Sequence, residues 1–358
     1  MKALVANRRI FTRIINLLTG KSIGANPSVK EIPKPKISNN EILIKVHATA
    51  LNPIDFKFCD FIAAPGSLLG CDFAGVVAEV GSGKSTTWKV GDRVAGFVQG
   101  GITNEHGAFA EYVKAEEDLV WRVPDGVSDE AASTYGVPAV TAMQALNKHL
   151  GVPWAEEVEK INKVEKSSPI FIYSGSTAVG LFAIQIAKKA GFTVVTTASP
   201  RSFDLVKNYG ADHVFDYHSS SSVNDIRKAF PNISRALDCY SEGDSSRFCA
   251  EVIKDNGNKV ITLLPLKTKV AGVVTQMIMS FQLLGRAFAW LPPIGPKYPV
   301  SSTDRAALVR FYKSLNTLAV DLKSPPLTVL NGGFDHIKEG LDRLRAGKVS
   351  GSKIVVKL

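Results

Sequence analysis

The chain has 358 residues, of which 45% are hydrophobic and 21% charged, a composition that excludes a disordered protein and allows two domains with full cores. Its 43 lysines and arginines exceed its 33 aspartates and glutamates. The resulting charge of +10 is spread along the chain, without a basic run that alternates with aromatic residues, so nucleic acid is not an expected partner. The four cysteines have no CxxC spacing, which indicates neither a disulfide framework nor a closely spaced zinc site and favours a reducing, cytoplasmic location.

The first thirty residues contain no acidic side chain and include Arg8, Arg9 and Arg13. This composition is also typical of organellar transit peptides, but we expect the segment to belong to the mature fold. Three apolar runs then predict strands at residues 42–46, 75–80 and 92–98. Because glycine-rich turns separate these runs, they indicate an antiparallel, barrel-like domain.

A helical pattern follows around residues 131–150. Residues 151–168 then form an irregular, charged connection with helical character. The periodicity changes after this connection, which marks the start of a second kind of domain.

Residues 170–180, with the sequence IFIYSGSTAVG, predict a nucleotide-binding turn. An apolar strand-like run leads into Gly175 and Gly180 and then into a helical pattern that ends before Gly191. Such a turn lets backbone amides and a helix N-terminus face a pyrophosphate. Because Thr177 stands at the middle glycine position of GxGxxG, the motif alone also fits an ordinary structural turn. A strand at residues 193–198 completes a βαβ unit.

The end of this second strand indicates which nicotinamide cofactor binds. An NAD-specific fold usually places a carboxylate there, on the ribose hydroxyls. The residues at this place are Ser199, Pro200, Arg201 and Ser202. A hydroxyl and a guanidinium suit a 2′-phosphate, so we expect NADPH rather than NADH. Ser199 or Ser202 also suits the N-cap of the helix expected at residues 203–209, and the two roles are compatible.

A third strand, at residues 213–217, ends at Tyr217, which we expect to stack on or hydrogen-bond to the adenosine half of the cofactor. Further on, residues 273–291 are apolar, but Gln276 and Arg286 interrupt them and an arginine is costly inside a bilayer, so no membrane helix is expected. The Met and Phe side chains of this stretch suit the wall of a channel for a lipophilic ligand. A core helix is the alternative.

Two more apolar runs, at residues 259–264 and 353–358, are separated by a proline-rich hinge at residues 291–299. The order of patterns predicts an α/β protein in which the C-terminal tail completes the N-terminal barrel, while a doubly wound dinucleotide-binding domain is inserted between them. Ligands are expected in the cleft between the two domains.

Six ordered motifs resemble the medium-chain dehydrogenase/reductase superfamily over nearly the whole chain. They are MKALV at residues 1–5, ALNPIDFK at 50–57, GCDFAGVVAEVG at 70–81, VGDRVAGF at 90–97, GAFAEYV at 107–113 and the glycine turn. The resemblance implies a GroES-like catalytic domain at residues 1–148, a Rossmann domain at 149–287 and a return to the catalytic domain at 288–358. It also assigns MKALV to the first strand.

Zinc enzymes of this superfamily carry Cys in the second motif and Gly-His-Glu in the third, because a catalytic zinc needs such ligands. Here Asn52 to Asp55 and Gly70-Cys71-Asp72 stand at those places, and the four-cysteine lobe is absent between Gly91 and Gly107. Cys71 with Asp72 lacks a histidine partner, so no metal is expected. The chain resembles the zinc-independent branch.

The runs SGSTAVG and TTASPRSFDLVKNYGADHVFDY, together with residues 135–142 and 347–351, closely resemble the trans-acting enoyl reductases of fungal highly reducing polyketide synthases. By this resemblance the cofactor contacts are Asn52, Pro53, Ile54, Asp55, Ser176, Thr177, Ala178, Val179, Ser199, Pro200, Arg201, Ser202, Tyr217, Leu264, Pro265, Val349 and Ser350. The substrate contacts are Tyr135, Gly136, Val137, Pro138, Ala139, Val140, Thr141, Ala142, Gly285, Arg286, Ala287, Phe288 and Ala289. The charged connection at residues 154–166 departs from the family pattern.

The resemblance implies an NADPH-dependent reduction of an α,β-unsaturated acyl thioester carried on the acyl carrier domain of a polyketide synthase. Tyr135 is the first candidate for the proton donor, with water or a packed, purely structural tyrosine as alternatives. Asp55 fits a loop-holding role as well as a cofactor contact, and His106 fits a solvated loop histidine. A free-standing quinone or enone reductase and a non-catalytic NADPH-binding protein are the competing functions, and the chain is expected as a monomer or a homodimer.

Overall fold

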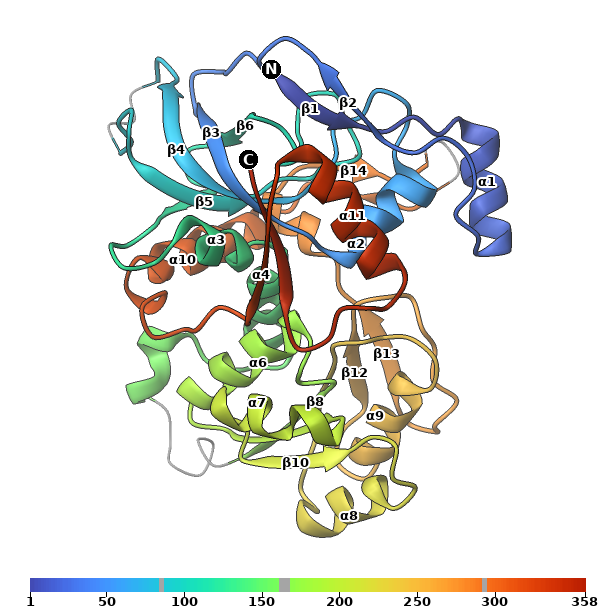
Figure 1. Cartoon of the computed structure of the whole chain (residues 1–358). Helices are drawn as coiled ribbons and strands as arrows, with labels where there is room; N and C mark the ends of the chain where they lie inside the picture. The colour runs from blue at the N-terminus through green and yellow to red at the C-terminus, as the bar shows by residue number, and fades with distance from the viewer. Residues whose placement is uncertain (84–86, 161–167, 292–294) are drawn as a thin grey trace. The chain divides into compact units, whose positions relative to one another are not determined.

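The computed structural model describes residues 1–83, 87–160, 168–291 and 295–358 (Figure 1). The chain forms two compact units. The first joins Met1–Val137 to Phe281–Leu358, and the second is Pro138–Ser280. The domain limits drawn from the sequence stay a prediction. Parts of the predicted connection at residues 151–168 and of the hinge at 291–299 lie outside the described residues.

Most strand pairs of the first unit are antiparallel, and its pair nearest the C-terminus is parallel. Its strands are β1 (Lys2–Val5), β2 (Ser28–Glu31), β3 (Glu41–Ala50), β4 (Asp72–Val80), β5 (Arg93–Phe97), β6 (Tyr112–Glu116), β7 (Val120–Arg122), β14 (Phe288–Ala289), β15 (Lys297–Tyr298), β16 (Leu327–Asn331) and β17 (Lys353–Lys357). Its helices are α1 (Ile10–Thr19), α2 (Pro53–Lys57), α3 (Asp129–Ala132), α10 (Ser302–Leu318) and α11 (Phe334–Arg345). The three strands predicted between residues 42 and 98 are confirmed as β3, β4 and β5.

The main sheet of this unit contains seven strands: six in the order β16-β17-β3-β4-β5-β7, and β6, which pairs with the first half of β3 on the same edge as β17. The C-terminal strand β17 pairs antiparallel with β3, where Val355 lies opposite Ala50. The expected completion of the N-terminal barrel by the C-terminal tail is therefore confirmed. Alternate apolar side chains of β3, such as Ile42, Ile44 and Val46, are buried in its core.

The second unit is a doubly wound α/β domain. Its elements are α4 (Val137–Met143), which begins at the last residue of the first unit, β8 (Pro169–Tyr173), α6 (Ala178–Lys189), β9 (Thr193–Ala198), α7 (Phe203–Asn208), β10 (His213–Asp216), α8 (Ser222–Ala229), β11 (Arg235–Asp238), α9 (Ser245–Ile253), β12 (Lys259–Thr262) and β13 (Val274–Met277). The six strands are all parallel, in the order β10-β9-β8-β11-β12-β13. This is the Rossmann order predicted by the βαβ pattern.

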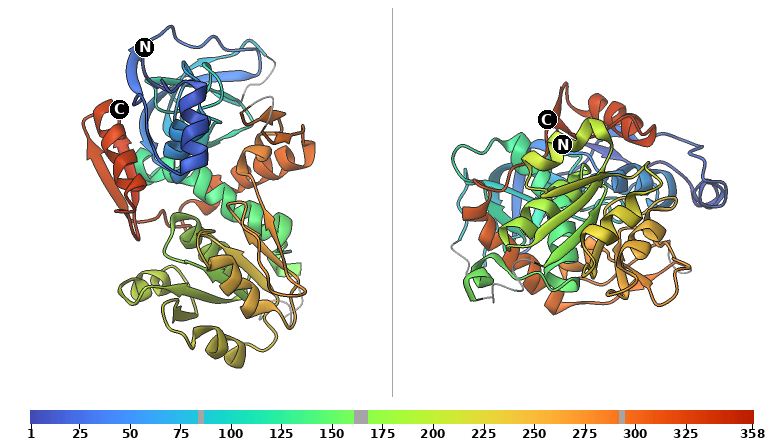
Figure 2. Two further views of the ribbon diagram at one scale, coloured as in Figure 1. Left: turned by 90° about the vertical axis from the view of Figure 1, so that its right-hand side faces the viewer. Right: turned by 90° about the horizontal axis from the view of Figure 1, so that it is seen from below.

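Helices lie on both faces of the parallel sheet (Figure 2). Phe171 and Tyr173 pack on one side of β8 against residues of α8 and α9. Strand alternation sends Ile170 and Ile172 to the opposite face, and α6 packs against β8. Both faces of the central strands are thus buried, which explains their continuous apolar runs.

The core-helix alternative for residues 273–291 is wrong. Residues Val274–Met277 form an edge strand because β12 offers its backbone groups, with Val274 opposite Lys259. A single 3₁₀ turn, Ser280–Leu284, then precedes β14. Throughout the described ranges, we find no helix whose length and apolar character suit a membrane crossing.

Candidate active site and cofactor turn

The turn between β8 and α6 is tight enough to require its two glycines. A Cβ on Gly175 would lie 2.2 Å from Thr196 Oγ1, and a Cβ on Gly180 would lie 2.6 Å from the carbonyl oxygen of Ser174. Ser174 itself has a φ of 58°, in the left-handed region. Only glycine fits at these two positions of the turn. A backbone without side chains can approach a phosphate closely.

Thr177 explains why the middle glycine of the motif is missing. Its Oγ1 accepts a hydrogen bond from the amide of Gly180 at 3.0 Å and donates one to the carbonyl oxygen of Ser174, also at 3.0 Å. Thr177 is thus the N-cap of α6. The substitution that weakens the motif adds a cap that holds the turn in shape.

Asp238, at the carboxyl end of β11, organises the neighbouring loop. It is fully buried, and its carboxylate accepts hydrogen bonds from the amides of Tyr240 and Ser241 and from the hydroxyls of Ser245 and Ser246. Four donors compensate the buried charge and fasten the start of α9 to the strand. Sequence reasoning missed this residue, whose only signal was an acid between an apolar run and a serine-rich loop.

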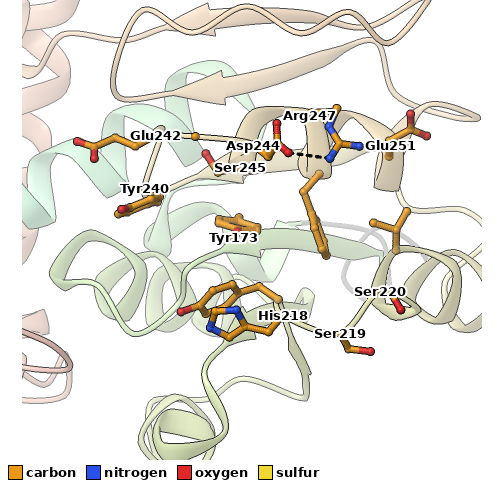
Figure 3. Close-up of a pocket in the computed structure, with 14 residues that line it drawn as sticks. Tyr173, His218, Ser219, Ser220, Tyr240, Glu242, Asp244, Ser245, Arg247 and Glu251 are labelled. Carbon is orange, nitrogen blue, oxygen red and sulfur yellow. Dashed lines mark hydrogen bonds and ion pairs between the residues drawn. The ribbon is translucent and has the colours of Figure 1, made fainter.

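An aromatic pocket of about 460 Å³ lies between the loops that follow β10 and β11 (Figure 3). The ring of Tyr217 lies 4.1 Å from that of His218 and 6.1 Å from that of Tyr173, by centroids. Arg247 and Asp244 form an ion pair of 2.8 Å at its rim. Of the predicted cofactor residues, Tyr217 alone is among those that line this pocket.

The segment after β9 leads into a helix, as the sequence predicted, but its serines do not cap that helix. Pro200–Ser202 forms a 3₁₀ turn that leads into α7. Ser199 and Ser202 occupy N-cap positions, yet neither side chain caps the backbone there. Their hydroxyl oxygens lie 3.5 Å apart instead, and Arg201 is exposed.

In the first unit, predicted cofactor residues belong to a buried polar cluster around Asn52. The amide of Asn52 donates to Asp55 Oδ2 at 2.7 Å, and its Nδ2 donates to Asp72 Oδ2 at 2.8 Å. Lys353 donates from Nζ to Asn52 Oδ1 and lies 4.0 Å from Asp72 Oδ2. All four side chains are almost fully buried. We call Asn52, Asp55, Asp72 and Lys353 the buried cluster.

Burial shifts the pKa values of the ionisable side chains in the cluster in the direction that favours their neutral forms. Desolvation raises the pKa of Asp55 to about 6, although hydrogen bonds from Asn52 and Cys71 and the charge of Lys353 oppose the rise. Burial likewise raises the pKa of Asp72 and lowers that of Lys353, while their mutual attraction opposes both changes. The ammonium group of Lys353 therefore acts as the counter-charge for the carboxyl groups of both Asp55 and Asp72.

Asp72 joins predicted cofactor and substrate segments. Besides Asn52, its carboxylate accepts a hydrogen bond of 2.7 Å from the amide of Val137. A Cβ on Gly136 would lie 2.2 Å from Asp72 Oδ1, so only glycine fits there. The loop at Asn52 and the chain entering α4 are thus held by one side chain. No cluster of three potential metal ligands occurs in the part of the chain that the structure describes.

Tyr135 is placed as a packed tyrosine. Its side chain is buried, its ring lies 5.3 Å from that of Trp121, and its hydroxyl donates to the carbonyl oxygen of Leu322, with that of Ala319 at 3.3 Å. The proton-donor role of Tyr135 stays a prediction, and this geometry favours the structural alternative. The predicted substrate residues from Pro138 to Ala142 lie in α4 and are buried.

The predicted substrate residues 285–289 border an aromatic group. Phe288 stacks on Tyr298 with 4.5 Å between ring centroids and meets Phe281 edge-on at 6.3 Å. Phe281 in turn lies 5.6 Å from Phe58, and Trp290 lies 5.7 Å from Phe58. Phe58 and Phe281 are buried, whereas Phe288, Trp290 and Tyr298 are half-buried. We call these rings the aromatic wall; its role as the wall of a ligand channel stays a prediction.

His106 is not the solvated loop histidine that we expected. Its Nε2 lies 3.2 Å from Arg286 Nη1, and its Nδ1 lies 3.3 Å from Thr103 Oγ1. Burial, aided by the charges of Arg286 and Lys114, lowers the pKa of His106 to about 4. The imidazole is therefore neutral at physiological pH.

The remaining predicted residues lie in connecting segments. Leu264 and Pro265 follow β12, close to where the amide of Leu263 donates to Ser241 Oγ at 2.8 Å. Val349 and Ser350 lie between α11 and β17, and Val349 packs at the edge of an apolar core. The predicted cofactor residues thus fall in both units.

Comparison with known proteins defines the class of protein. Residues 38–125 match the alcohol dehydrogenase GroES-like domain family, and residues 178–288 match the zinc-binding dehydrogenase family. The quinone oxidoreductase of Coxiella burnetii shares the fold with a TM-score of 0.67 and 24% identity, covering 100% of this chain and 99% of the other. A mycobacterial protein solved with NADPH has a TM-score of 0.70, 18% identity and full coverage of both chains. The chain belongs to the medium-chain dehydrogenase/reductase family.

A closer relative sharpens this assignment. The trans-enoyl reductase ACTTS2 of Alternaria alternata is 38% identical over 337 residues, which cover 92% of this chain and 95% of the relative. The chain is accordingly an oxidoreductase of the enoyl reductase type.

Proposed function

We propose that the protein is an NADPH-dependent, trans-acting enoyl reductase that reduces α,β-unsaturated acyl thioesters on the acyl carrier domain of a polyketide synthase. The observation that carries this proposal is the likeness to a trans-enoyl reductase over nine tenths of the chain. The glycine turn and the aromatic pocket support the nucleotide half of the proposal. The four cysteines, all reduced and buried, are consistent with a cytoplasmic enzyme.

The second unit offers groups that fit a dinucleotide. The turn at Gly175 and Gly180 would receive the pyrophosphate at the N-terminus of α6. Tyr217 would contact the adenosine in the aromatic pocket. Ser199 and Arg201 would hold the 2′-phosphate, since the guanidinium and hydroxyl donate to its oxygens. When bound, the reduced nicotinamide supplies a hydride to the β-carbon of the enoyl group.

The first unit would hold the reacting groups in place. The buried cluster keeps the Asn52 loop and the entry to α4 in a fixed geometry, which favours a near-attack arrangement. The aromatic wall around Phe288 suits a lipophilic acyl chain. Because Tyr135 donates to a backbone carbonyl, we assign the proton that reaches the α-carbon to water.

A direct test uses purified protein, NADPH and two acceptors. We expect oxidation of NADPH with a butenoyl thioester of N-acetylcysteamine and formation of the saturated thioester. Turnover of small quinones without any reduction of the thioester would instead support a free-standing quinone reductase. Binding of NADPH without turnover of either acceptor would support a non-catalytic protein.

A further inference from the structure

Helix α1 buries its polar face and exposes its apolar face. Its buried side chains are polar: Asn16 is fully buried and Arg13 is 7% exposed. Asn16 Nδ2 donates to the carbonyl oxygens of Asp60 and Ile23, both at 3.0 Å, and Asn16 Oδ1 accepts from the amide of Ile23. Arg13 donates to the carbonyl oxygen of Ile62. The polar face of α1 therefore binds the rest of the first unit.

The opposite face of α1 is apolar and exposed to solvent. Phe11 is 77% exposed and Leu18 is 81% exposed, and Ile15 lies between them on the same stripe of the helix. Ile10 and Leu17 extend this surface. Figure 1 and the right-hand view of Figure 2 both show α1 standing out from the remainder of its unit. A contiguous apolar patch of this kind on a folded protein marks an interaction site.

The base of this helix is rigidly held. Arg8 Nη1 lies 2.6 Å from Asp60 Oδ1, and both side chains are at most 2% exposed. Arg345 of α11 also pairs with Asp60, at 2.8 Å. A surface fixed in this way loses little conformational entropy on binding.

The charge around the patch selects the partner. Residues 1–30 contain six cationic side chains and no anionic one, and two of the six, Arg8 and Arg13, are buried. Arg9 and Lys21 flank the apolar stripe and are exposed. We propose that α1 docks an acidic protein surface with an apolar centre, presented by the protein that carries the thioester. This inference rests on the proposed function and names the surface through which it acts in trans.

Two other occupants fit the charges less well. A second copy of the chain would set the same patch against itself, so Arg9 and Lys21 of one copy would face cations with no acidic side chain of the segment to pair with. An interfacial membrane helix turns a cationic polar face to water, whereas the polar face of α1 is buried in the unit. An acidic protein satisfies both the apolar stripe and the cations.

The test compares one enoyl group on two carriers. A butenoyl group is loaded on the acyl carrier domain of the synthase or attached to N-acetylcysteamine, and each thioester is reduced by the wild type and by Phe11→Ser/Leu18→Ser. We expect KM for the carrier-bound thioester to rise at least 10-fold in the variant, with kcat and KM for the small thioester within twofold. The matched control, Val300→Ser/Val320→Ser, removes two exposed valines away from α1 and is expected to change neither KM.

Direct calorimetric binding of the unloaded carrier domain makes the test independent of turnover. We expect Phe11→Ser/Leu18→Ser and the charge-reversed Arg9→Glu/Lys21→Glu each to weaken this binding at least 10-fold. Equal carrier affinity for the wild type and both variants would overturn the inference, even if the small thioester is reduced and the proposed function stands. A variant that changes only the sedimentation coefficient, or only binding to phosphatidylserine vesicles, would overturn it in favour of a second copy or a membrane. Failure to reduce either thioester, with carrier binding intact, would count against the proposed function alone.

Discussion

The glycine turn of the second unit and the buried cluster of the first unit are held in place by different kinds of interaction. The turn at residues 174–180 is held by the Thr177 cap, by the close approach of Gly180 to Ser174, and by Thr196 of the neighbouring strand, which leaves no room for a side chain at Gly175. The buried cluster joins Asn52 to Asp72 and to Lys353, which is 301 residues away in sequence. The shape of the glycine turn thus depends mainly on steric contacts between residues close in sequence. The buried cluster depends on the electrostatic balance between two buried carboxyl groups and the ammonium group of Lys353.

The largest effect is expected from removing that cation. Lys353→Met leaves Asp55 and Asp72 buried without a counter-charge, so we expect a loss of about 3–5 kcal/mol in the free energy of unfolding. The control is Lys357→Met, on the same strand, whose exposed ammonium pairs with Glu130 and should contribute far less, because solvent screens the pair. Urea denaturation measures both variants. Similar losses for the two would mean that the cluster has no special electrostatic role.

The pH dependence of stability separates the two sites, because residues 174–180 contain no titratable side chain. The pKa of Asp55 is raised to about 6 in the fold, so the folded state binds more protons than the unfolded state between about pH 4 and 6. Its contribution to stability is present at pH 4 and is lost as the pH rises through 6. We expect the stability of Asp55→Asn, relative to the wild type, to improve by up to about 3 kcal/mol over this range.

Urea titrations of both proteins at pH 4, 5, 6 and 7 provide the measurement for Asp55. A difference that stays constant with pH would contradict the raised pKa. Thr177→Ser in the turn is the matched control, and its difference from the wild type should not vary with pH.

Arg201→Ala tests the proposed preference of the second unit for NADPH over NADH. Loss of a charge-assisted hydrogen bond should weaken NADPH binding by about 1.5–3 kcal/mol and leave NADH binding nearly unchanged. Lys207→Ala, an exposed cation on the adjoining α7, is the control and should affect both cofactors little. Fluorescence titration gives the six dissociation constants, for the wild type and the two variants with each cofactor. Equal weakening of NADPH and NADH by Arg201→Ala would remove the assignment of the 2′-phosphate to this residue.

The smallest effect is expected at the cap. Thr177→Ala removes the acceptor for the Gly180 amide and should cost about 1 kcal/mol of stability, whereas Thr177→Gly should cost only a few tenths. Thermal unfolding of the two variants and of Thr177→Ser, which keeps the hydroxyl, measures this order. If serine costs as much as alanine, the hydroxyl is not the stabilising group.

Much of the fold was predictable because its signals are local. The apolar runs of β3, β4, β8 and β9 and the glycine turn depend on neighbouring residues, and the structure has them where the sequence indicated. Lys353 looked like an ordinary charge at the start of a strand, because only tertiary contacts bring it to Asn52 and Asp72.

Two other features were missed for the same reason. Burial in the fold lowers the pKa of His106 to about 4, and the charge of Arg286, 180 residues away, adds to this effect, so the neighbouring sequence does not predict it. The stretch at residues 273–291 is apolar enough for a helix, yet the free edge of β12 decides that it begins as a strand. In each case a partner distant in sequence outweighs the local pattern.

The central claim, hydride transfer to an activated double bond, is tested most directly by isotope labelling. Wild-type protein is given NADPH that carries deuterium on the transferable position of the nicotinamide, with a butenoyl thioester as acceptor. We predict one deuterium at the β-carbon of the saturated product, with a solvent hydrogen at the α-carbon, as read by NMR and mass spectrometry. Deuterium at the carbonyl carbon, or a product without label, would contradict the account.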